Sequence, residues 1–340
     1  AHPLPSVGQR YWGAPRRQLL CVRIAVVNVT PLTLIPLPCH AVVIPRAGLT
    51  FWGDDGLVNG IGQISPKKRK VTPMGNAYEI YALRYATMSP RTPNMNFLAP
   101  DPHETTAADL DYFVWLVRGH GREILVDTGF NAEEAKARSR KLTLNPVDAL
   151  EKFGVSADGI KDVIVTHLHY DHAGNLDRFP SARFNLQERE MSYATGRCMC
   201  NGMLRHPFSV EHVTTMVRHV YGERVTFHSG DGEIAPGVTV HRVGGHSDGL
   251  QVVRVETARG PVVLASDAAH YYANLQKRSP FPIVYNVGDM AQGWETVERL
   301  AGHPDRFIPG HDPLVSEIYP RASDKVDAFA AAGHMPEMQS

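Results

Sequence analysis

The sequence Thr-His-Leu-His-Tyr-Asp-His at residues 166–172 gathers three histidines and one aspartate on a single short segment. It follows an apolar run typical of a β-strand and precedes a turn that contains glycine, which predicts a loop at the carboxyl end of a strand. Alternate residues of an extended segment point the same way, so we expect His167 and His169 to bind one metal ion. As the chain turns, Asp171 and His172 can face a second ion. Imidazole and carboxylate groups are typical ligands of Zn²⁺ and related divalent cations.

Around this segment, short apolar runs alternate with helical patterns. A first set of expected strands comprises residues 78–86, 112–117, 123–126 and 162–165. A second set comprises residues 224–227, 238–243, 251–255 and 262–265. Helical periodicity covers residues 132–140, 146–153 and 289–301. Two strand-rich halves, each with helices, predict a mixed α/β domain in which two sheets pack together with helices outside.

Charge divides the 340-residue chain into two unlike parts. Residues 1–73 contain nine Lys or Arg, two Asp and no Glu, although the formal net charge of the whole chain is zero. This stretch is rich in Pro and Gly and shows no sustained period, so we interpret residues 1–73 as a leader or extension and residues 74–340 as the folded domain. Its basic run at 66–71 resembles a nuclear localisation signal. Alternatively, Met74 is the natural start and the leader is not native.

The composition is that of an ordinary globular protein, with 43% hydrophobic and 21% charged residues. The apolar segment 24–45 is long enough to span a membrane, but its four prolines would leave backbone groups unpaired in lipid. We therefore predict no membrane segment. The four cysteines, Cys21, Cys39, Cys198 and Cys200, are too few for a disulfide framework in a chain of this length. They indicate free thiols in a reducing, cytoplasmic compartment.

The motif at 166–172 resembles the His-x-His-x-Asp-His signature of the metallo-β-lactamase superfamily, whose fold is a four-layer αββα sandwich. The resemblance extends over residues 78–320. It implies three further ligands, and the sequence offers a candidate for each. These candidates are His246 in Gly-His-Ser-Asp-Gly, Asp267 directly after an expected strand, and His311 in Pro-Gly-His-Asp.

The resemblance also implies how the ligands divide between two divalent ions, for which Zn²⁺ is the expected metal. One ion is bound by His167, His169 and His246, the other is bound by Asp171, His172 and His311, and Asp267 bridges both. The sequence Val-Asp-Thr-Gly at 126–129 matches an early strand-end motif of the superfamily. Asp127 is therefore expected to accept a hydrogen bond from a metal-bound histidine. Residues 74–340 would then be a hydrolase domain.

Two adjacent divalent ions can lower the pKa of a shared water toward neutrality, so the resemblance implies hydrolysis by a metal-bridging hydroxide. Asp171 would return the proton to the leaving group. Segments 266–272 and 310–313 resemble the N-acyl homoserine lactonases, quorum-quenching enzymes that open a lactone ring. A subset of these enzymes has a tyrosine three residues after the bridging aspartate, where this chain has His270 followed by Tyr271. Either residue could donate a hydrogen bond to the substrate carbonyl, or both could simply pack beside the site.

Other functions stay open at this point. The apolar residues of the insert 198–219 either line a groove for an acyl chain or belong to the core. The chain could instead hydrolyse a different lactone or, like glyoxalase II, a thioester. A nuclear, nucleic-acid-associated protein or nuclease is a third alternative, but the acidic remainder of the chain offers no extended basic face for phosphates. The expected partner is a small lactone and no nucleic acid, and the resemblance allows a homodimer.

Overall fold

The computed structural model describes residues 77–103 and 108–331. The expected leader, 1–73, lies outside these residues, as do its apolar segment 24–45 and its basic run 66–71. The described residues therefore fall within the region that the sequence predicts to be the folded domain.

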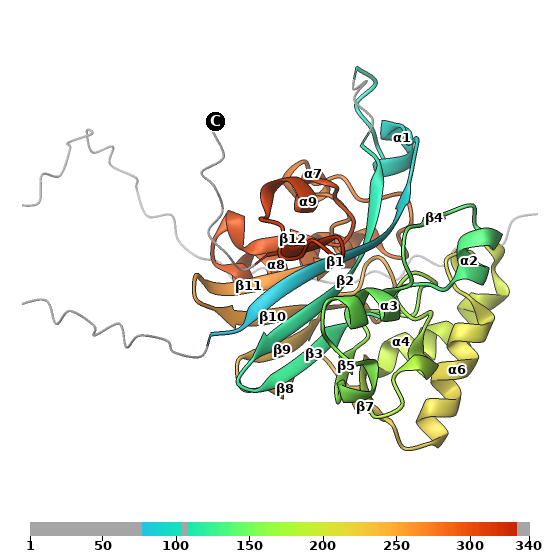
Figure 1. Ribbon diagram of the computed structural model, residues 1–340. Helices are drawn as coiled ribbons and strands as arrows, with labels where there is room; N and C mark the ends of the chain where they lie inside the picture. Colours follow the sequence, from blue (N-terminus) through green and yellow to red (C-terminus); the bar gives the residue numbers. More distant parts are fainter. Residues whose placement is uncertain (1–76, 104–107, 332–340) are drawn as a thin grey trace, which may run out of the picture. The chain divides into compact units, whose positions relative to one another are not determined.

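Two β-sheets form the centre of the described region (Figure 1). The larger sheet has eight strands: β1 (Glu79–Met88), β2 (Leu110–Gly119), β3 (Arg122–Val126), β4 (Lys141–Leu142), β5 (Asp162–Ile164), β6 (Arg183–Gln187), β7 (Val225–His228) and β13 (Ala328–Ala330). The smaller sheet has five: β8 (Gly232–Ala235), β9 (Val238–Arg242), β10 (Gln251–Thr257), β11 (Gly260–Ser266) and β12 (Phe307–Pro309). The strand orders are β13-β1-β2-β3-β5-β6-β7, with β4 beside β1, and β12-β11-β10-β9-β8.

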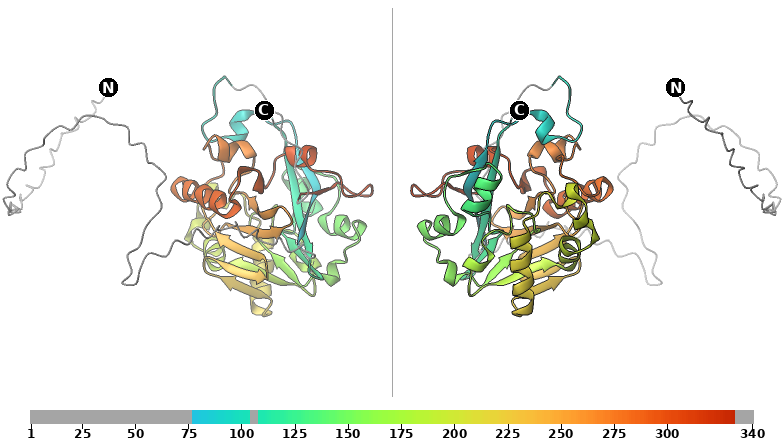
Figure 2. Two further views of the ribbon diagram at one scale, coloured as in Figure 1. Left: turned by 90° about the vertical axis from the view of Figure 1, so that its left-hand side faces the viewer. Right: turned by 90° about the vertical axis from the view of Figure 1, so that its right-hand side faces the viewer.

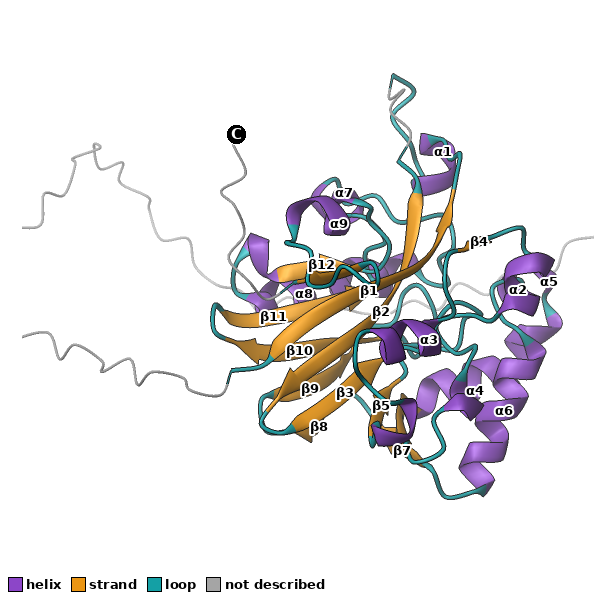
Figure 3. Ribbon diagram, viewed as in Figure 1, coloured by secondary structure: helices purple, strands orange, loops and turns teal. Residues whose placement is uncertain are grey.

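Helices flank the sheets (Figure 3). They are α1 (Pro93–Asn96), α2 (Ala132–Ala137), α3 (Pro146–Lys152), α4 (Glu188–Thr195), α5 (Gly202–Arg205), α6 (Val210–Tyr221), α7 (Tyr272–Gln276), α8 (Val287–Ala301) and α9 (Leu314–Ile318). The longest, α8, lies against β10, β11 and β12, whereas α3 and α4 lie against the larger sheet. Helix α8 begins after Asn286, whose side chain accepts hydrogen bonds from first-turn N–H groups, and ends at Gly302, which has the left-handed conformation. Within the described ranges, no helix combines the length and apolar character needed to cross a lipid bilayer.

Alternate side chains of the strands feed separate hydrophobic cores, because successive residues point to opposite faces of a sheet. In β2, Val114 joins the core beside the larger sheet, whereas Trp115 joins the core between the sheets. In β10, Val253 joins the core between the sheets, whereas Val252 joins a third core under α8. Each buried side chain of this size contributes about 1.5–3 kcal/mol. Three cores separate four layers (Figure 2), so the αββα sandwich expected from the sequence is confirmed.

The expected strands and helices are present, with ends that shift by a few residues. One placement was wrong: residues 224–227 were expected in the second strand set, but β7 pairs in parallel with β6 of the larger sheet. The physical reason is the connection, because α4 and α6 lie between β6 and β7 in the chain. Such a helical crossover brings the chain back to the same sheet as a parallel neighbour.

The insert 198–219 divides between the two interpretations of its apolar residues. Val213 and Met216 of α6 are buried in the core beside the larger sheet. In contrast, Met203 is 82% exposed and Val210 is 72% exposed. Core packing therefore explains the inner face of α6 but not the exposed apolar residues on and near α5.

Candidate metal centre

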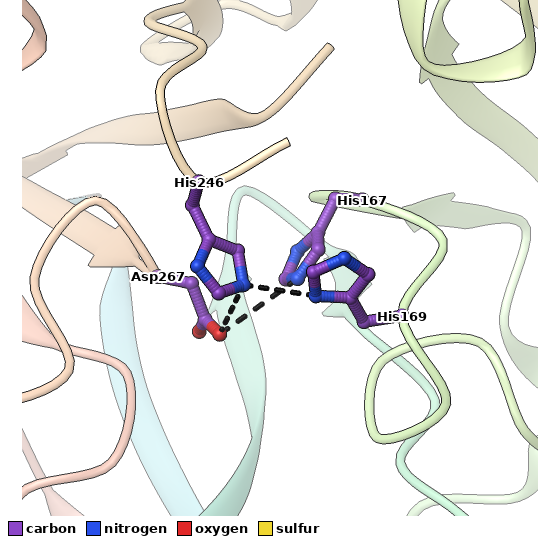
Figure 4. Close-up of side chains that lie close together, drawn as sticks. All are labelled: His167, His169, His246 and Asp267. Atoms are coloured by element: carbon purple, nitrogen blue, oxygen red, sulfur yellow. Dashed lines mark hydrogen bonds and ion pairs between the residues drawn. The ribbon is translucent and has the colours of Figure 1, made fainter. Parts of the chain in front are cut away.

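Four loops at neighbouring strand ends bring the expected ligands together. Residues 166–172 follow β5, His246 lies between β9 and β10, Asp267 follows β11, and His311 follows β12. Two histidines of the first loop point toward His246 and Asp267 (Figure 4). Because β5 belongs to the larger sheet and β11 to the smaller, both sheets contribute to the cluster.

The carboxylate of Asp267 lies in the middle of the cluster, 2% exposed. Its Oδ2 is 3.1 Å from His246 Nε2 and 3.7 Å from His167 Nε2. Its Oδ1 is 3.1 Å from His311 Nε2 and 3.4 Å from His172 Nε2. The two oxygens thus face different sets of imidazoles, with His270 Nε2 also 3.0 Å from Oδ2, and such a division suits a bridging carboxylate.

Two further residues complete the cluster. His169 Nδ1 lies 2.9 Å from His246 Nε2. Asp171 approaches His172 Nε2 at 3.7 Å and His311 Nε2 at 3.9 Å. Ligand atoms within 4.8 Å of one another form one group of His167, His169, His246 and Asp267 and another of Asp171, His172 and His311. The structure therefore brings every expected ligand together, while their binding of metal stays a prediction.

In three histidines of the cluster, the outer ring nitrogen contacts an oxygen atom that fixes the ring orientation. His172 Nδ1 lies 2.8 Å from Asp127 Oδ2, His246 Nδ1 lies 2.6 Å from Ile283 O, and His311 Nδ1 lies 2.8 Å from Asp111 O. Oxygen acceptors at Nδ1 assign the proton to that nitrogen in each ring. The Nε2 lone pairs then face the interior of the cluster, as metal ligation requires.

Several buried atoms of the cluster lack a hydrogen-bond partner. They are Nε2 of His167, His172 and His311, and Oδ1 of Asp267. Buried polar atoms are seldom left unpaired, because each costs about 1–3 kcal/mol. Burial, reinforced by neighbouring imidazoles, lowers the pKa of His167 and of His169 well below the ordinary value. Burial opposes the change at His172 and His311, but the charge of Asp267 and other carboxylates raises the pKa of both. Imidazole nitrogens and carboxylate oxygens whose unpaired atoms converge fit divalent cations, which displace protons from such ligands on binding.

Asp127 supports the loop that follows β5. It is 2% exposed, and its Oδ1 accepts a hydrogen bond from Thr166 N at 2.7 Å, while Oδ2 takes the bond from His172. This is the contact with a cluster histidine that the sequence predicts for Asp127. Asp127 and Ser266 have φ angles of 63° and 46°, in the left-handed region that non-glycine residues seldom adopt. Backbone strain of about 1–3 kcal/mol at each is typical of functional sites.

Glu190 is a buried carboxylate that the sequence analysis missed. Its Oε1 accepts a hydrogen bond from Leu168 N at 2.9 Å, and its Oε2 accepts bonds from Ser247 Oγ at 2.7 Å and Gly249 N at 3.0 Å. Glu190 thereby ties the histidine-rich loop to the loop that carries His246. A Cβ on Gly249 would lie 2.1 Å from the Glu190 nitrogen, so this approach requires glycine. A glutamate in the first turn of a helix is ordinary, and nothing in the sequence marks this one.

His270 and Tyr271, either of which was expected to contact the substrate, lie in different surroundings. His270 Nε2 is 3.0 Å from Asp267 Oδ2, and its ring stacks on Phe281 with centroids 3.7 Å apart. Burial lowers the pKa of His270 to about 3, although Asp267 opposes the shift. The Tyr271 hydroxyl instead bonds Asn96 Oδ1 at 3.2 Å. The structure brings His270 to the cluster and leaves Tyr271 in a neighbouring hydrogen-bond network.

Two cavities meet at the cluster. The inner cavity, about 210 Å³, is lined by residues that include Arg91, Tyr112, Arg140, Asp171, Asp267 and His270. The apolar cavity, about 380 Å³, is lined by residues that include Tyr193, Met203, Leu204, Pro207, Val284 and Tyr285. His169 and His246 belong to the walls of both. A ligand at the cluster can therefore extend in two chemically different directions.

Known proteins resemble this chain in sequence and in fold. The family model of the metallo-beta-lactamase superfamily matches residues 108–311. An N-acyl homoserine lactonase of a Bacillus species is 28% identical over 188 residues, which are 51% of this chain and 70% of that protein. A second N-acyl homoserine lactonase, from Bacillus thuringiensis, is 29% identical over 136 residues, 40% of this chain and 49% of the relative. The chain thus spans about half the length of the second relative.

A crystal structure of a quorum-quenching N-acyl homoserine lactone lactonase superposes with a TM-score of 0.58 at 23% sequence identity. The superposition covers 70% of this chain and 93% of that one, and at this identity it supports the fold alone. The family model covers more than half of the 340 residues and contains all seven expected ligands. The two-sheet sandwich and the cluster between its sheets agree with that match, and the chain belongs to the metallo-β-lactamase superfamily.

Proposed function

We propose that this chain is a metal-dependent hydrolase that opens the lactone ring of N-acyl homoserine lactones. The observation that carries the proposal is the position of Asp267. Within 3.7 Å, its Oδ1 faces His172 and His311, and its Oδ2 faces His167, His246 and the further residue His270. Such a carboxylate suits two adjacent cations, and paired cations are suited to hydrolysis. The names of the lactonase relatives supply the substrate class.

The proposed ligand sets follow the two groups of side chains in the cluster. One cation would be held by His167, His169 and His246, the other by Asp171, His172 and His311, with Asp267 shared. When bound, such cations supply Lewis acidity, which promotes ionisation of a water molecule near neutral pH and polarises a carbonyl. Imidazole and carboxylate donors in these numbers suit Zn²⁺.

Two side chains would act on the substrate. Ring opening leaves an alkoxide, and Asp171, whose side chain is 12% exposed and lines the inner cavity, would carry the proton to it at a carboxylate oxygen. His270 is neutral at physiological pH because of its lowered pKa, so it carries a single N–H. That N–H lies at Nε2 beside Asp267 and could be shared with the carbonyl oxygen of the lactone.

The apolar cavity gives the acyl chain of such a substrate a place to lie. Its side chains are mainly aliphatic and aromatic, and a volume of about 380 Å³ accommodates a medium-length chain. The exposed Met203 stands in its wall, and a flexible methionine adapts to chains of different length.

The proposal is tested by titrating acid release from a panel of acyl homoserine lactones, other lactones and thioesters, with the metal content of the protein measured. We expect hydrolysis of the acyl homoserine lactones and about two bound metal ions per chain. No acid release from any lactone would refute the proposed function.

A matched pair of variants tests the site itself. Asp267→Ala should lose most of the bound metal and most of the activity, because it removes the shared carboxylate. Asp158→Ala, which changes an exposed aspartate outside the cluster, should keep both. Full metal content and activity in Asp267→Ala would show that the ligands lie elsewhere.

A further inference from the structure

The inner cavity differs from the apolar cavity in its charge. Three arginines, Arg91, Arg138 and Arg140, line its wall together with the cluster residues. Its two carboxylates, Asp171 and Asp267, both belong to the proposed ligand sets, so bound cations would neutralise them. A neutral lactone alone gives no reason for this concentration of positive charge.

Arg91 is a buried cation whose partners are neutral. It is 5% exposed, its Nε donates to Asn96 Oδ1 at 2.7 Å, and its Nη1 contacts Met88 Sδ at 2.9 Å. Its Nη2 donates to the backbone oxygen of Met95. Among the described residues, no carboxylate forms an ion pair with it. Because arginine stays protonated, its charge persists in a region of low dielectric constant, where it attracts an anion strongly.

Arg140 approaches the same cavity from the connection between α2 and β4. Its Nε donates to Tyr170 Oη at 3.0 Å, and its Nη1 donates to a backbone oxygen. No hydrogen bond from Nη2 and no ion pair is present in the part of the chain that the structure describes. Tyr170 Oη lies 3.0 Å from Tyr112 Oη, so the guanidinium connects to a phenol beside the cluster. Burial raises the pKa of Tyr112 to about 12, and the charges of Arg140 and Arg91 both oppose that rise.

Arg138, in the same wall, has a partner for each of its guanidinium nitrogens. Its Nε pairs with Glu134 at 2.7 Å, and its two other nitrogens donate to the backbone oxygens of His206 and Phe208 at 2.9 and 3.0 Å. Its charge is compensated and its donors are used. Arg91 and Arg140 are therefore the two arginines of the cavity with charge to offer a ligand.

We infer that the inner cavity is a carboxylate subsite, in which Arg91 and Arg140 hold an anionic group carried by the ring portion of the substrate. This inference rests on the proposed lactone hydrolysis and goes beyond it, because it adds lactones that bear a ring carboxylate to the neutral N-acyl homoserine lactones as substrates. An apolar arm of the same substrate would lie in the apolar cavity, on the other side of His169 and His246. A volume of about 210 Å³ suits a small ring with one such substituent.

The test compares a γ-butyrolactone that carries a ring carboxylate with the same lactone as its carboxamide. Hydrogen bonds to a charged group commonly change affinity by about tenfold or more, so we expect the wild type to prefer the carboxylate by at least that factor in kcat/KM. Arg140→Gln should remove most of the preference, mainly by raising KM for the carboxylate substrate far more than for the carboxamide. Arg140→Lys should keep part of it, because the charge remains without the planar donor pair.

Arg278→Gln is the matched control, because Arg278 is exposed, pairs with Glu298 and lines neither cavity. Binding of glutarate to the metal-loaded protein, measured by calorimetry, gives a second readout that needs no turnover. We expect weaker glutarate binding to Arg140→Gln than to Arg278→Gln.

The outcomes separate this inference from the proposed function. Equal kcat/KM for carboxylate and carboxamide, unchanged in Arg140→Gln, would overturn the subsite and leave lactone hydrolysis intact. If no lactone is hydrolysed, the proposed function fails, and weaker glutarate binding to Arg140→Gln would still support the subsite. Equal glutarate binding to the two variants would overturn it.

Discussion

Replacing Asp127 with asparagine tests one hydrogen bond of the candidate metal centre without changing a proposed ligand. In the structure, Asp127 Oδ2 lies 2.8 Å from His172 Nδ1, and Oδ1 accepts from Thr166 N at 2.7 Å. An asparagine has one oxygen and one NH₂ group at these positions. In either orientation its NH₂ group opposes a donor, either the N–H of Thr166 or that of His172.

We expect Asp127→Asn to lower the affinity for metal. In the metal-free variant, His172 can exchange tautomers, accept a bond from the amide at Nδ1 and turn an Nε2–H toward Asp267 Oδ1, 3.4 Å away. That tautomer has no lone pair for a cation at Nε2, so binding must restore the other tautomer and lose the new bond. A hydrogen bond of this kind contributes about 2 kcal/mol, which corresponds to a loss of about thirtyfold in affinity. The same range is typical when a residue that orients a metal ligand is changed.

The assay is competition for Zn²⁺ with a chromophoric chelator, together with metal analysis after dialysis. We expect one ion to bind about thirtyfold more weakly and the other to bind as in the wild type. The free energy of unfolding of the metal-free variant should lie within about 1 kcal/mol of the wild-type value. Asp327→Asn, which changes a paired carboxylate outside the cluster, is the control for metal affinity. Wild-type affinity at both sites in Asp127→Asn would refute the reasoning, and so would equal loss at both.

Three further predictions concern stability. Glu190→Ala leaves three donors of two loops unpaired, so we expect the free energy of unfolding in urea to fall by about 3 kcal/mol or more, and a loss below about 1 kcal/mol would contradict the assigned contacts. Burial raises the pKa of Asp327, but hydrogen bonds and charges from Arg84 and Arg321 outweigh burial and hold the pKa below its ordinary value. A depressed folded pKa stabilises the fold above the unfolded pKa of about 4 and loses that contribution as pH falls through the folded value. The stability difference between wild type and Asp327→Asn should therefore shrink between about pH 7 and pH 3, and a larger difference in acid would exclude this ion pair as its cause. Removal of metal by a chelator should lower the midpoint of thermal unfolding, and addition of Zn²⁺ should restore it. When the free Zn²⁺ concentration is a hundredfold above Kd, a single bound ion adds about 2.7 kcal/mol to the free energy of unfolding. An unchanged midpoint would argue against a bound ion in the native state.

Two strand-rich halves, each with helices, predicted two packed sheets, and the superfamily resemblance implied the four-layer sandwich. Val252 and Val253 are adjacent in the chain and belong to different cores, as period-two alternation requires. The superfamily resemblance is likewise confirmed by the family model. Turns and crossovers are harder to predict, because the residues of β7 do not indicate which sheet the strand joins. That choice depends on where the connecting helices direct the chain.

The residues of the candidate site could be predicted from the sequence where ligands are close together in the chain or follow strand ends, as in residues 166–172 and at Asp267. They could not be predicted where one side chain joins distant segments. Glu190 contacts residues on loops before and after it in the chain, and Phe281 stacks on His270 from a separate loop. Arg91 stands out only through its burial. Such roles arise from tertiary contacts, and local patterns carry no trace of them.

The pairing of β1 with β13 has a consequence for how the protein is made. Leu83 of β1 lies opposite Ala328 of β13. Except at Ala86 and Thr87, which pair with β4, this edge of β1 therefore stays without its neighbour until nearly all the described residues have left the ribosome. Contacts between such distant segments form slowly, since a long loop must close before they stabilise anything. During synthesis, β1 would present an unpaired edge that can associate with other nascent chains. Chains cut short before β13 should therefore aggregate more readily than the full-length protein, even though they retain every proposed metal ligand.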